Sequence, residues 1–484
     1  MKYWNVLLAF ALLILVFFPT HAQSKTDRID QLMRAFHNLG QFSGTVLVAE
    51  SGQVIYRNSF GMANLSWQVQ NSLDTKFMLA SVSKQFTAML ILQQVSRGKL
   101  RLNGTIADYL PNYPAAIGRR ITLHQLLNHT SGISDVTNLP DFDTRYAHRR
   151  LTSDELLAIF QNLPLEFEPG SKFGYSNSGY SVLAAILEAV TGKSYAQLLS
   201  EQITGPLGMA QTGYVPNEQV ISRLATGYRW APLDGYIQAA YFDNSLSLGA
   251  GGIYSSIDDL YRWDRALYGQ QLLPDSLKRG MFTAYLNNYG YGFNVRKWEH
   301  PRTHDTLTFV EHGGANAGFN TLISRSIDDQ NLIILLTNTN EAKLGFVRNR
   351  LRSILYELPY DLPEPDLKDL VAADLKGKGL AAAKVKYAAL KKERLAEYGE
   401  QEFIYQFSQL GYSLLLSGHP AEALAIYQLN VDSFPSSSKA FDDLAEAYLL
   451  QGKTELARRY YNRAYELDTN NVRAKQMAEK ISTQ

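Results

Sequence analysis

Apolar residues follow two different spacings along the N-terminal part of the chain. Helical spacing predicts an amphipathic helix over 27–39 and a second helix over 82–97, which is apolar on almost every side. Alternation around the dipeptide Ser51-Gly52 predicts a β-hairpin over 42–61. Strand patterns return much later, at 291–298, 306–310, 319–324 and 332–337. Strands at both ends with helices between them predict an α+β domain, with one sheet built from the terminal segments and flanked by helices.

The pattern changes after residue 356. Prolines crowd a short linker over 357–366, and no strand pattern follows in 367–484. Seven residues between 403 and 436 recur 34 positions later: Phe407, Leu410, Leu415, Leu416, Gly418, Ala423 and Tyr427 match Phe441, Leu444, Leu449, Leu450, Gly452, Ala457 and Tyr461. This period resembles the tetratricopeptide repeat, with clear units at 403–436 and 437–470 and a degenerate one near 367–398. Such repeats expose a concave face, so we expect a protein partner there.

Composition narrows the class of protein. The 484 residues hold 47 Lys plus Arg against 46 Asp plus Glu, so no basic field favours nucleic acid. Residues 1–22 combine a basic start, an apolar run and small residues before a cut after Ala22, which predicts a signal peptide. We expect an exported protein, periplasmic or secreted, without a stable membrane span unless the signal stays uncleaved and anchors it. Cysteine is absent, so no disulfide framework is available.

The pattern Ser-x-x-Lys supplies a nucleophile and a base in one helical turn. It occurs three times, at Ser81–Lys84, Ser96–Lys99 and Ser436–Lys439. Only Ser81 opens a long buried helix, whereas Ser96 stands at a helix end and Ser436 in a turn between repeat helices. Burial against apolar walls lets Lys84 lose its proton more readily than it would in water. Ser81 and Lys84 are therefore the leading catalytic candidates.

Two further segments carry groups suited to a cleft. Tyr175-Ser176-Asn177 follows a Pro-Gly turn and precedes a predicted helix, so a phenol and an amide are placed at a loop–helix junction. His312-Gly313-Gly314 follows the predicted strand 306–310, and its glycines let backbone amides approach a substrate closely. Each segment is a weak signal alone, because short patterns of this kind recur by chance.

Together these segments resemble the β-lactamase-related serine hydrolases, which include the class C β-lactamases and penicillin-binding proteins. The resemblance rests on six segments in the family's order: 77–84, 126–132, 168–180, 206–209, 251–260 and 312–319. It covers roughly residues 27–356 and implies a β-lactamase/transpeptidase-like fold with an antiparallel sheet. The all-α tetratricopeptide-like region then follows as a separate domain.

The resemblance also implies a role for each candidate residue. Ser81 is the nucleophile, Lys84 and Tyr175 share the proton transfers, and Asn177 holds Lys84 and a substrate amide. The backbone N–H groups of Ser81 and Ala315 form the oxyanion hole, and Gly313 and Gly314 line the substrate site. Whether Lys84 or Tyr175 is the general base stays open, because a coupled pair can titrate as one unit. No metal and no cofactor is implied.

One departure from the family bears on the substrate. Many β-lactamases of this fold have Lys-Thr-Gly where this chain has His312-Gly313-Gly314. Near neutral pH an imidazole is mostly uncharged and can accept a hydrogen bond, so a fixed positive charge is missing. We therefore expect an esterase or a D-aminopeptidase-like enzyme that acts on a small molecule or peptide through an acyl-serine.

Two other functions compete with this expectation. One is a D,D-peptidase or β-lactamase that acts on D-Ala-D-Ala peptides or β-lactams, and the other is a non-catalytic binding protein that uses its repeats. Intact catalytic residue types disfavour the second. His129 is expected to be structural within a capped turn, and Pro301 argues against a metal pair at His300 and His304.

Overall fold

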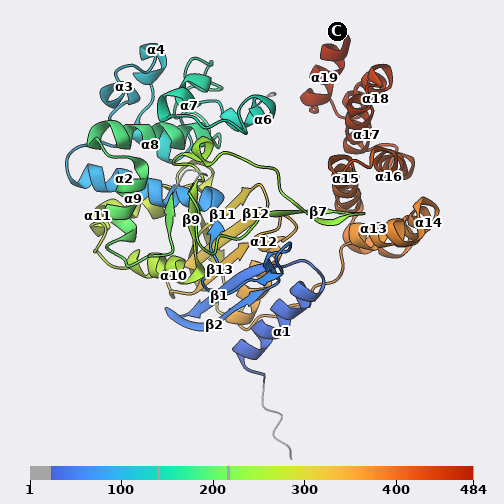
Figure 1. Cartoon of the computed structure of the whole chain (residues 1–484), viewed down its shortest axis with the longest axis horizontal. Helices are drawn as coiled ribbons and strands as arrows, with labels where there is room; N and C mark the ends of the chain where they lie inside the picture. The colour runs from blue at the N-terminus through green and yellow to red at the C-terminus, as the bar shows by residue number, and fades with distance from the viewer. Residues whose placement is uncertain (1–22, 140–141, 215–218, 483–484) are drawn as a thin grey trace, which may run out of the picture.

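A six-stranded sheet is the frame of the N-terminal domain (Figure 1). The computed structural model describes residues 23–139, 142–214 and 219–482, so the expected signal peptide at 1–22 lies outside the described residues. The strand order is β10-β11-β12-β13-β1-β2, with every pair antiparallel. The strands are β1 (Gly44–Glu50), β2 (Gln53–Phe60), β10 (Asn294–Glu299), β11 (Thr306–Asn316), β12 (Phe319–Ser326) and β13 (Leu332–Thr337). The expected sheet of terminal segments is confirmed.

Both faces of the sheet are buried at its central strands β1 and β13, whose successive side chains point to opposite faces. Val46 and Val48 of β1 pack against α1 (Lys25–Asn38) and α12 (Leu344–Leu355). The alternate residues, Leu47 and Ala49, belong to the larger core on the other face. β1 can therefore lie in the interior of the sheet, between β13 and β2.

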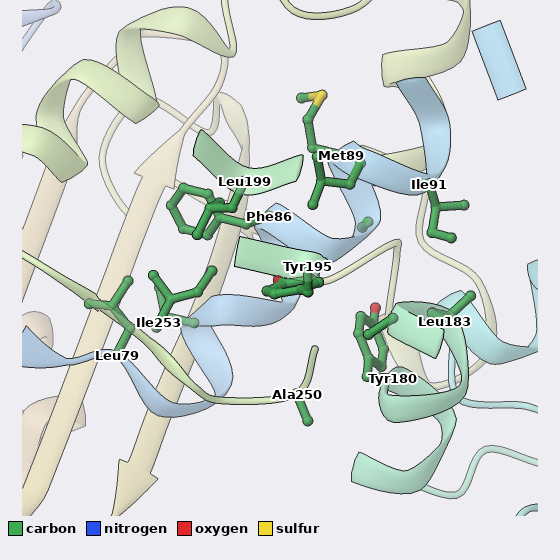
Figure 2. Packing of buried hydrophobic residues seen from close by; sticks show 14 of the residues in the cluster. Leu79, Phe86, Met89, Ile91, Tyr180, Leu183, Tyr195, Leu199, Ala250 and Ile253 are labelled. Atoms are coloured by element: carbon green, nitrogen blue, oxygen red, sulfur yellow. The ribbon is translucent and has the colours of Figure 1, made fainter. Parts of the chain in front are cut away.

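The helix α2 (Lys84–Ser96) runs through the middle of the larger core. Figure 2 shows Phe86, Met89 and Ile91 of this helix in one cluster with residues of α8 (Asn177–Thr191) and α9 (Tyr195–Leu199). Phe86 is fully buried and stacks on Trp263 with 4.3 Å between ring centroids. A helix that is apolar on all sides is thus enclosed on all sides, as its sequence predicts.

The remaining elements connect the sheet and this core. The other helices of the domain are α3 (Ile106–Tyr109), α4 (Ala115–Gly118), α5 (Leu123–Leu127), α6 (Phe142–Arg145), α7 (Ser153–Phe160), α10 (Ile257–Ala266) and α11 (Asp275–Lys278). Short strands are β3 (Met62–Asn64), β4 (Val69–Gln70), β5 (Phe77–Met78), β6 (Gly213–Tyr214), β7 (Tyr228–Ala231), β8 (Gly235–Gln238) and β9 (Ile253–Ser255). β7 and β8 form a hairpin that reaches toward the helical region (Figure 1).

Three of the boundaries that differ from the sequence prediction lie close to the candidate site residues or in the sheet. Ser81 lies in a 3₁₀ turn, η1 (Ala80–Ser83), and the α-helix begins only at Lys84. β11 does not end before His312 but continues through Asn316, because Gly313 and Gly314 stay paired with Leu322 and Thr321 of β12. The strand expected from 291 begins at Asn294. Glycine-rich sequence indicates a loop, yet a neighbouring strand can hold it extended.

Residues beyond 366 form only helices within the described part of the chain, which confirms the expected helical region. They are α13 (Leu367–Lys378), α14 (Leu380–Tyr398), α15 (Glu400–Leu416), α16 (Pro420–Ser433), α17 (Ser438–Leu450), α18 (Thr454–Leu467) and α19 (Val472–Ser482). Gly411 is needed at one helix contact, since a Cβ there would lie 2.5 Å from the ring of Tyr427. Among the described helices, none combines the length and hydrophobicity that a bilayer span requires.

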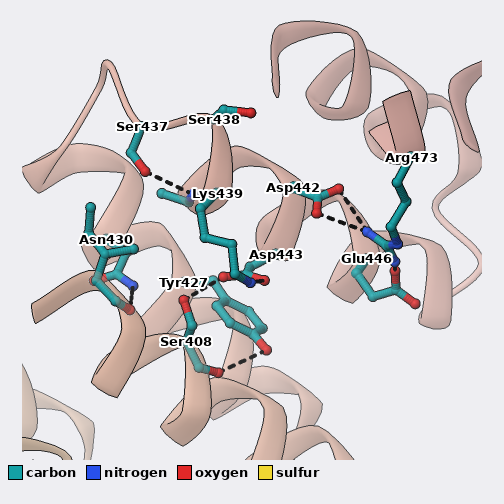
Figure 3. A network of polar contacts seen from close by, with 12 residues as sticks. Ser408, Tyr427, Asn430, Ser437, Ser438, Lys439, Asp442, Asp443, Glu446 and Arg473 are labelled. Carbon is teal, nitrogen blue, oxygen red and sulfur yellow. Dashed lines mark hydrogen bonds and ion pairs between the residues drawn. The ribbon is translucent and has the colours of Figure 1, made fainter. Parts of the chain in front are cut away.

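Polar contacts tie successive helices of this region together (Figure 3). Arg473 of α19 donates to both carboxylate oxygens of Asp442 on α17, at 2.8 and 2.9 Å, and pairs with Glu446. Ser408 of α15 donates to Asp443 of α17. The helix α17 is therefore fixed to α15 and to α19, the helices two positions away on either side of it.

The enclosure of α2 generates a stability prediction. Phe86→Ala should lower the free energy of unfolding by about 3–5 kcal/mol, because the lost ring leaves a cavity against Trp263. Trp67→Ala is the control, since Trp67 is 82% exposed and its removal should change little. Urea unfolding, followed by tryptophan fluorescence and circular dichroism, measures both. Equal effects of the two substitutions would contradict this picture of the core.

Candidate active site

Ser81 stands on a strained turn held by the sheet. Ala80, the residue before it, has a φ of +47°, a left-handed conformation that costs energy for any residue but glycine. The turn is held by Thr321 of β12, whose hydroxyl donates to the carbonyl of Leu79 at 2.7 Å. On the other side, the backbone N–H of Ile253 donates to the Ser83 hydroxyl at 3.1 Å. The sheet thus fixes the position of the Ser81 turn ahead of α2.

Lys84 is fully buried beneath this turn. Its Nζ lies 3.2 Å from Ser81 Oγ, 2.7 Å from Asn177 Oδ1 and 2.8 Å from the carbonyl oxygen of Ala250. Burial disfavours the charged amine and lowers the pKa of Lys84 to about 7. Near neutral pH a large share of the amine is therefore uncharged and able to accept the Ser81 proton.

Asp135 orients Asn177 and is a residue that the sequence analysis missed. One oxygen of Asp135 accepts from the backbone N–H of Asn177 at 3.1 Å and from its side-chain amide at 3.0 Å. The amide oxygen of Asn177 is thereby turned toward Lys84. The charge of Asp135 also raises the pKa of Lys84, against the larger effect of burial. Asp135 comes from a loop with no periodicity and no motif, so the sequence held no signal for it.

Tyr175 lies beside Lys84 and is partly exposed to solvent. It exposes 36% of its surface, and Lys84 Nζ lies 4.8 Å from its ring centroid. Burial of the phenol nevertheless raises the pKa of Tyr175 above its usual range, although a hydrogen bond with Ser81 lowers it in part. The phenol is therefore protonated at neutral pH and can act as a hydrogen-bond donor.

His129 packs behind Tyr175, with 4.2 Å between their ring centroids. Its Nδ1 accepts from the backbone N–H of Ser176 at 3.1 Å, and burial lowers its pKa well below the usual value. A neutral ring in this place supports Tyr175 rather than reacting with a substrate, in line with the structural role expected from the sequence.

His312 uses both ring nitrogens inside the protein. Its Nδ1 lies 2.6 Å from the carbonyl oxygen of Gly313, which can only accept, so Nδ1 carries the proton. Its Nε2 must then accept from the hydroxyl of Tyr289, at 2.8 Å. Burial lowers the pKa of His312 to about 4, so the ring is uncharged at neutral pH. Tyr289 is a second residue that the sequence analysis missed, because a lone buried tyrosine carries no pattern.

The end of β11 passes directly beside the Ser81 turn. A Cβ on Gly314 would lie 2.2 Å from the carbonyl oxygen of Leu79 and 2.5 Å from Thr321 Oγ1, so only glycine fits there. At Gly313 the nearest such contact is 3.7 Å, which leaves its face open. The strand therefore brings the backbone of Ala315 next to the turn that carries Ser81.

A buried lysine beside a serine on a strained turn is the arrangement that the sequence predicts for the site of a serine hydrolase. The model of the Beta-lactamase family matches residues 29–357, and the chain belongs to this family. It is 32% identical over 338 residues to a putative penicillin-binding protein, PbpX, of Bacillus subtilis strain 168, covering 69% of this chain and 80% of the relative. It is 28% identical over 290 residues to a D-aminopeptidase of Brucella anthropi, covering 57% of this chain and 52% of that enzyme.

Solved structures show the same fold. EstCE1, a hydrolase with promiscuous acyltransferase activity, aligns with a TM-score of 0.59 at 24% sequence identity. The alignment covers 68% of this chain and 97% of EstCE1. The comparisons therefore establish the β-lactamase-type fold and the class of enzyme. The roles of single residues, the boundaries 27–356, 357–366 and 367–484, and the tetratricopeptide assignment stay predictions.

The geometry around Lys84 generates a prediction about pH. If the neutral amine accepts the Ser81 proton, kcat/KM should fall about tenfold per pH unit below the pKa of Lys84, about 7, and level off above it. Asp135→Asn removes a charge that raises this pKa, so the acid limb should move to lower pH. Initial rates with 4-nitrophenyl acetate between pH 5 and pH 9 measure both.

The control for this experiment is Asp258→Asn, which removes a surface carboxylate paired with Arg57. Its pH profile should match that of the unaltered protein. An acid limb that stays in place or moves upward in Asp135→Asn would show that Lys84 is not the titrating base.

Proposed function

We propose that this protein hydrolyses esters or amides through an acyl group carried on Ser81, as an esterase- or D-aminopeptidase-like enzyme. The observation that carries this proposal is the contact of a buried, low-pKa Lys84 with the Ser81 hydroxyl at 3.2 Å. A serine hydroxyl is a weak nucleophile until a neighbouring base takes its proton. Few surroundings other than a catalytic site justify burying an amine beside it.

In the acylation step, neutral Lys84 takes the proton of Ser81 as Oγ forms a bond to the substrate carbonyl carbon. The negative charge that develops on the carbonyl oxygen is held by the backbone N–H groups of Ser81 and Ala315. We assign the base role to Lys84 rather than Tyr175, because burial lowers the pKa of the amine but raises the pKa of the phenol. Asn177 keeps the amine in place throughout.

Collapse of this intermediate breaks the bond to the leaving group, which needs a proton. Tyr175 is placed to donate it, because its phenol is protonated and lies on the open side of Lys84. The proton that Lys84 accepted restores the phenol. A water molecule then attacks the acyl-serine by the same proton transfers in reverse order, releasing the acid and free Ser81.

Neutral substrates fit this site better than substrates with a carboxylate beside the reacting bond. His312 is uncharged, and both its nitrogens are engaged by Gly313 and Tyr289. The similarity to a D-aminopeptidase agrees with this choice. Many β-lactamases of this fold have a lysine where this chain has His312, and that fixed cation is missing here.

Two further proposals concern the rest of the chain. The segment 1–22 directs export to the periplasm or the medium, in keeping with its basic and apolar pattern. The helical region binds a protein partner through tetratricopeptide-like repeats, as its 34-residue period indicates.

The nucleophile is tested by substitution at all three Ser-x-x-Lys serines. Ser81→Ala should remove nearly all turnover of 4-nitrophenyl acetate, because Ser81 is the serine whose hydroxyl is hydrogen-bonded to Lys84 among the described residues. Ser96→Ala and Ser436→Ala are matched controls and should keep the full rate. A fluorophosphonate probe should label the unaltered protein but not Ser81→Ala. More than a few per cent of the activity left in Ser81→Ala would refute the assignment.

The preference for neutral substrates is tested by comparing substrate classes. We expect kcat/KM for a neutral ester and for D-alanine 4-nitroanilide to exceed that for benzylpenicillin or a D-Ala-D-Ala peptide by roughly 10- to 100-fold. The missing charge-assisted hydrogen bond accounts for about 1.5–3 kcal/mol. The reverse order would make the protein a D,D-peptidase or β-lactamase.

A further inference from the structure

The root of the β7–β8 hairpin is built into the rim of the candidate active site. Gly227, just before β7, lies against Gly318 in the turn that follows β11, and a Cβ on Gly227 would lie 3.0 Å from Gly318 Cα. Just after β8, the backbone N–H of Ala239 donates to the carbonyl of Gly227 at 2.9 Å. The hairpin therefore begins and ends beside the strand that carries Ala315.

A cavity of about 320 Å³ lies at this root. Its described lining residues carry no charge at neutral pH and include Met78, Thr226, Gln238, Phe242, Ala317 and Phe319. Neither Lys84 nor Tyr175 lines it. A substrate that keeps its leaving group close to Tyr175 to receive a proton would direct its acyl group toward this cavity, where Met78 and Asn316 adjoin the Ser81 turn and Ala315 in sequence. We call it the acyl pocket.

The other side of the hairpin is fixed to the helical region. Arg229 of β7 donates to the carbonyl of Leu416, at the end of α15, at 3.1 Å. At the tip, Asp234 contacts His419 with 3.0 Å between Oδ2 and Nε2. Trp230 packs partly buried against the hydrophobic core of the helices, as does Leu233.

The contact at Trp230 also involves a buried lysine that has two partly exposed carboxylate partners. Lys368 of α13 lies over the Trp230 ring, with its Nζ 4.3 Å from the centroid. The same amine contacts Glu341, which follows β13, at 2.9 Å and Asp369 at 3.1 Å. An amine held by two carboxylates and a ring has little freedom to move. The contact of Lys368 with Trp230 therefore restricts the movement of the hairpin relative to α13.

Because its two strands are paired, the hairpin can pass a displacement at one end to the other end. Trp230 pairs with Tyr236 across the two strands, and Tyr228 pairs with Gln238, which lines the acyl pocket. Four residues of strand span only about 13 Å. Over that distance two hydrogen-bonded strands move together, so a shift at Trp230 displaces Gln238 and the residues after it.

We propose that the helical region sets the width of the acyl pocket through the β7–β8 hairpin. Selectivity among acyl groups then depends on helical residues that never touch the substrate. This inference rests on the proposed hydrolysis through Ser81, and it makes Trp230 and His419 positioning residues. Release of the hairpin should impair large acyl groups and spare acetyl, which is too small to need the pocket wall.

The test compares two 4-nitrophenyl esters, the acetate and the phenylacetate, in the full-length protein. In Trp230→Ala the ratio of kcat/KM for phenylacetate to that for acetate should fall at least fivefold, with acetate within twofold of the unaltered protein. His419→Ala should shift the ratio in the same direction by about twofold or more. Lys343→Ala is the matched control, because its ion pair with Asp366, at 3.0 Å, joins the hydrolase domain to the residue that precedes α13 without the hairpin.

Hydrogen–deuterium exchange provides a readout that needs no turnover. Residues 238–242 should exchange faster in Trp230→Ala and His419→Ala than in Lys343→Ala. An unchanged ratio and unchanged exchange would overturn the inference, and so would equal changes in the control. If Trp230→Ala does not fold, the ratio of kcat/KM values and the exchange rates of His419→Ala test the inference by themselves. If the unaltered protein hydrolyses neither ester, the proposed function is contradicted. The exchange data would still test whether the helical region is coupled to residues 238–242.

Discussion

The burial of one amine, that of Lys84, is the constraint on which the rest of the hydrolase domain depends. A charged amine in an apolar interior is costly, and the domain meets this cost by lowering the pKa to about 7 and surrounding Nζ with three oxygen acceptors. Those acceptors come from the Ser81 turn, α8 and the loop before β9. The central position of α2 follows from the need to bring these segments together.

Other features help to hold Ser81 beside Lys84, and some of them cost conformational energy locally. Ala80 adopts a left-handed φ, and Gly314 has no room for a side chain, so the Ser81 turn and β11 meet at backbone distance. Asp135 holds Asn177 and opposes part of the effect of burial on Lys84. Strain and close approach are thus concentrated where the chemistry is proposed, which is where proteins generally tolerate them.

The sequence predicts those parts of the site that lie on one periodic element or within a recurring motif. Ser81 and Lys84 are three residues apart, so helical spacing alone brings them together. Asp135 and Tyr289 escape prediction because each acts through a contact with a distant segment, and a lone polar residue in a loop has no period. The same holds for Arg229 and Leu416, which are 187 residues apart. The continuation of β11 through Gly313 was missed because pairing with β12, rather than local preference, holds it extended.

The pairing of β1 with β13 has a consequence for how the chain reaches this structure. Ser51 and Asn331, at one end of this pair, are joined by a hydrogen bond across 280 residues. The sheet cannot close until nearly the whole domain has been synthesised, and contacts of such high sequence separation form slowly. The C-terminal helices rely on neighbours in sequence and need no such wait. The nascent N-terminal half of the domain therefore stays open until β13 has been made, whereas each C-terminal helix can pack soon after its neighbour is made.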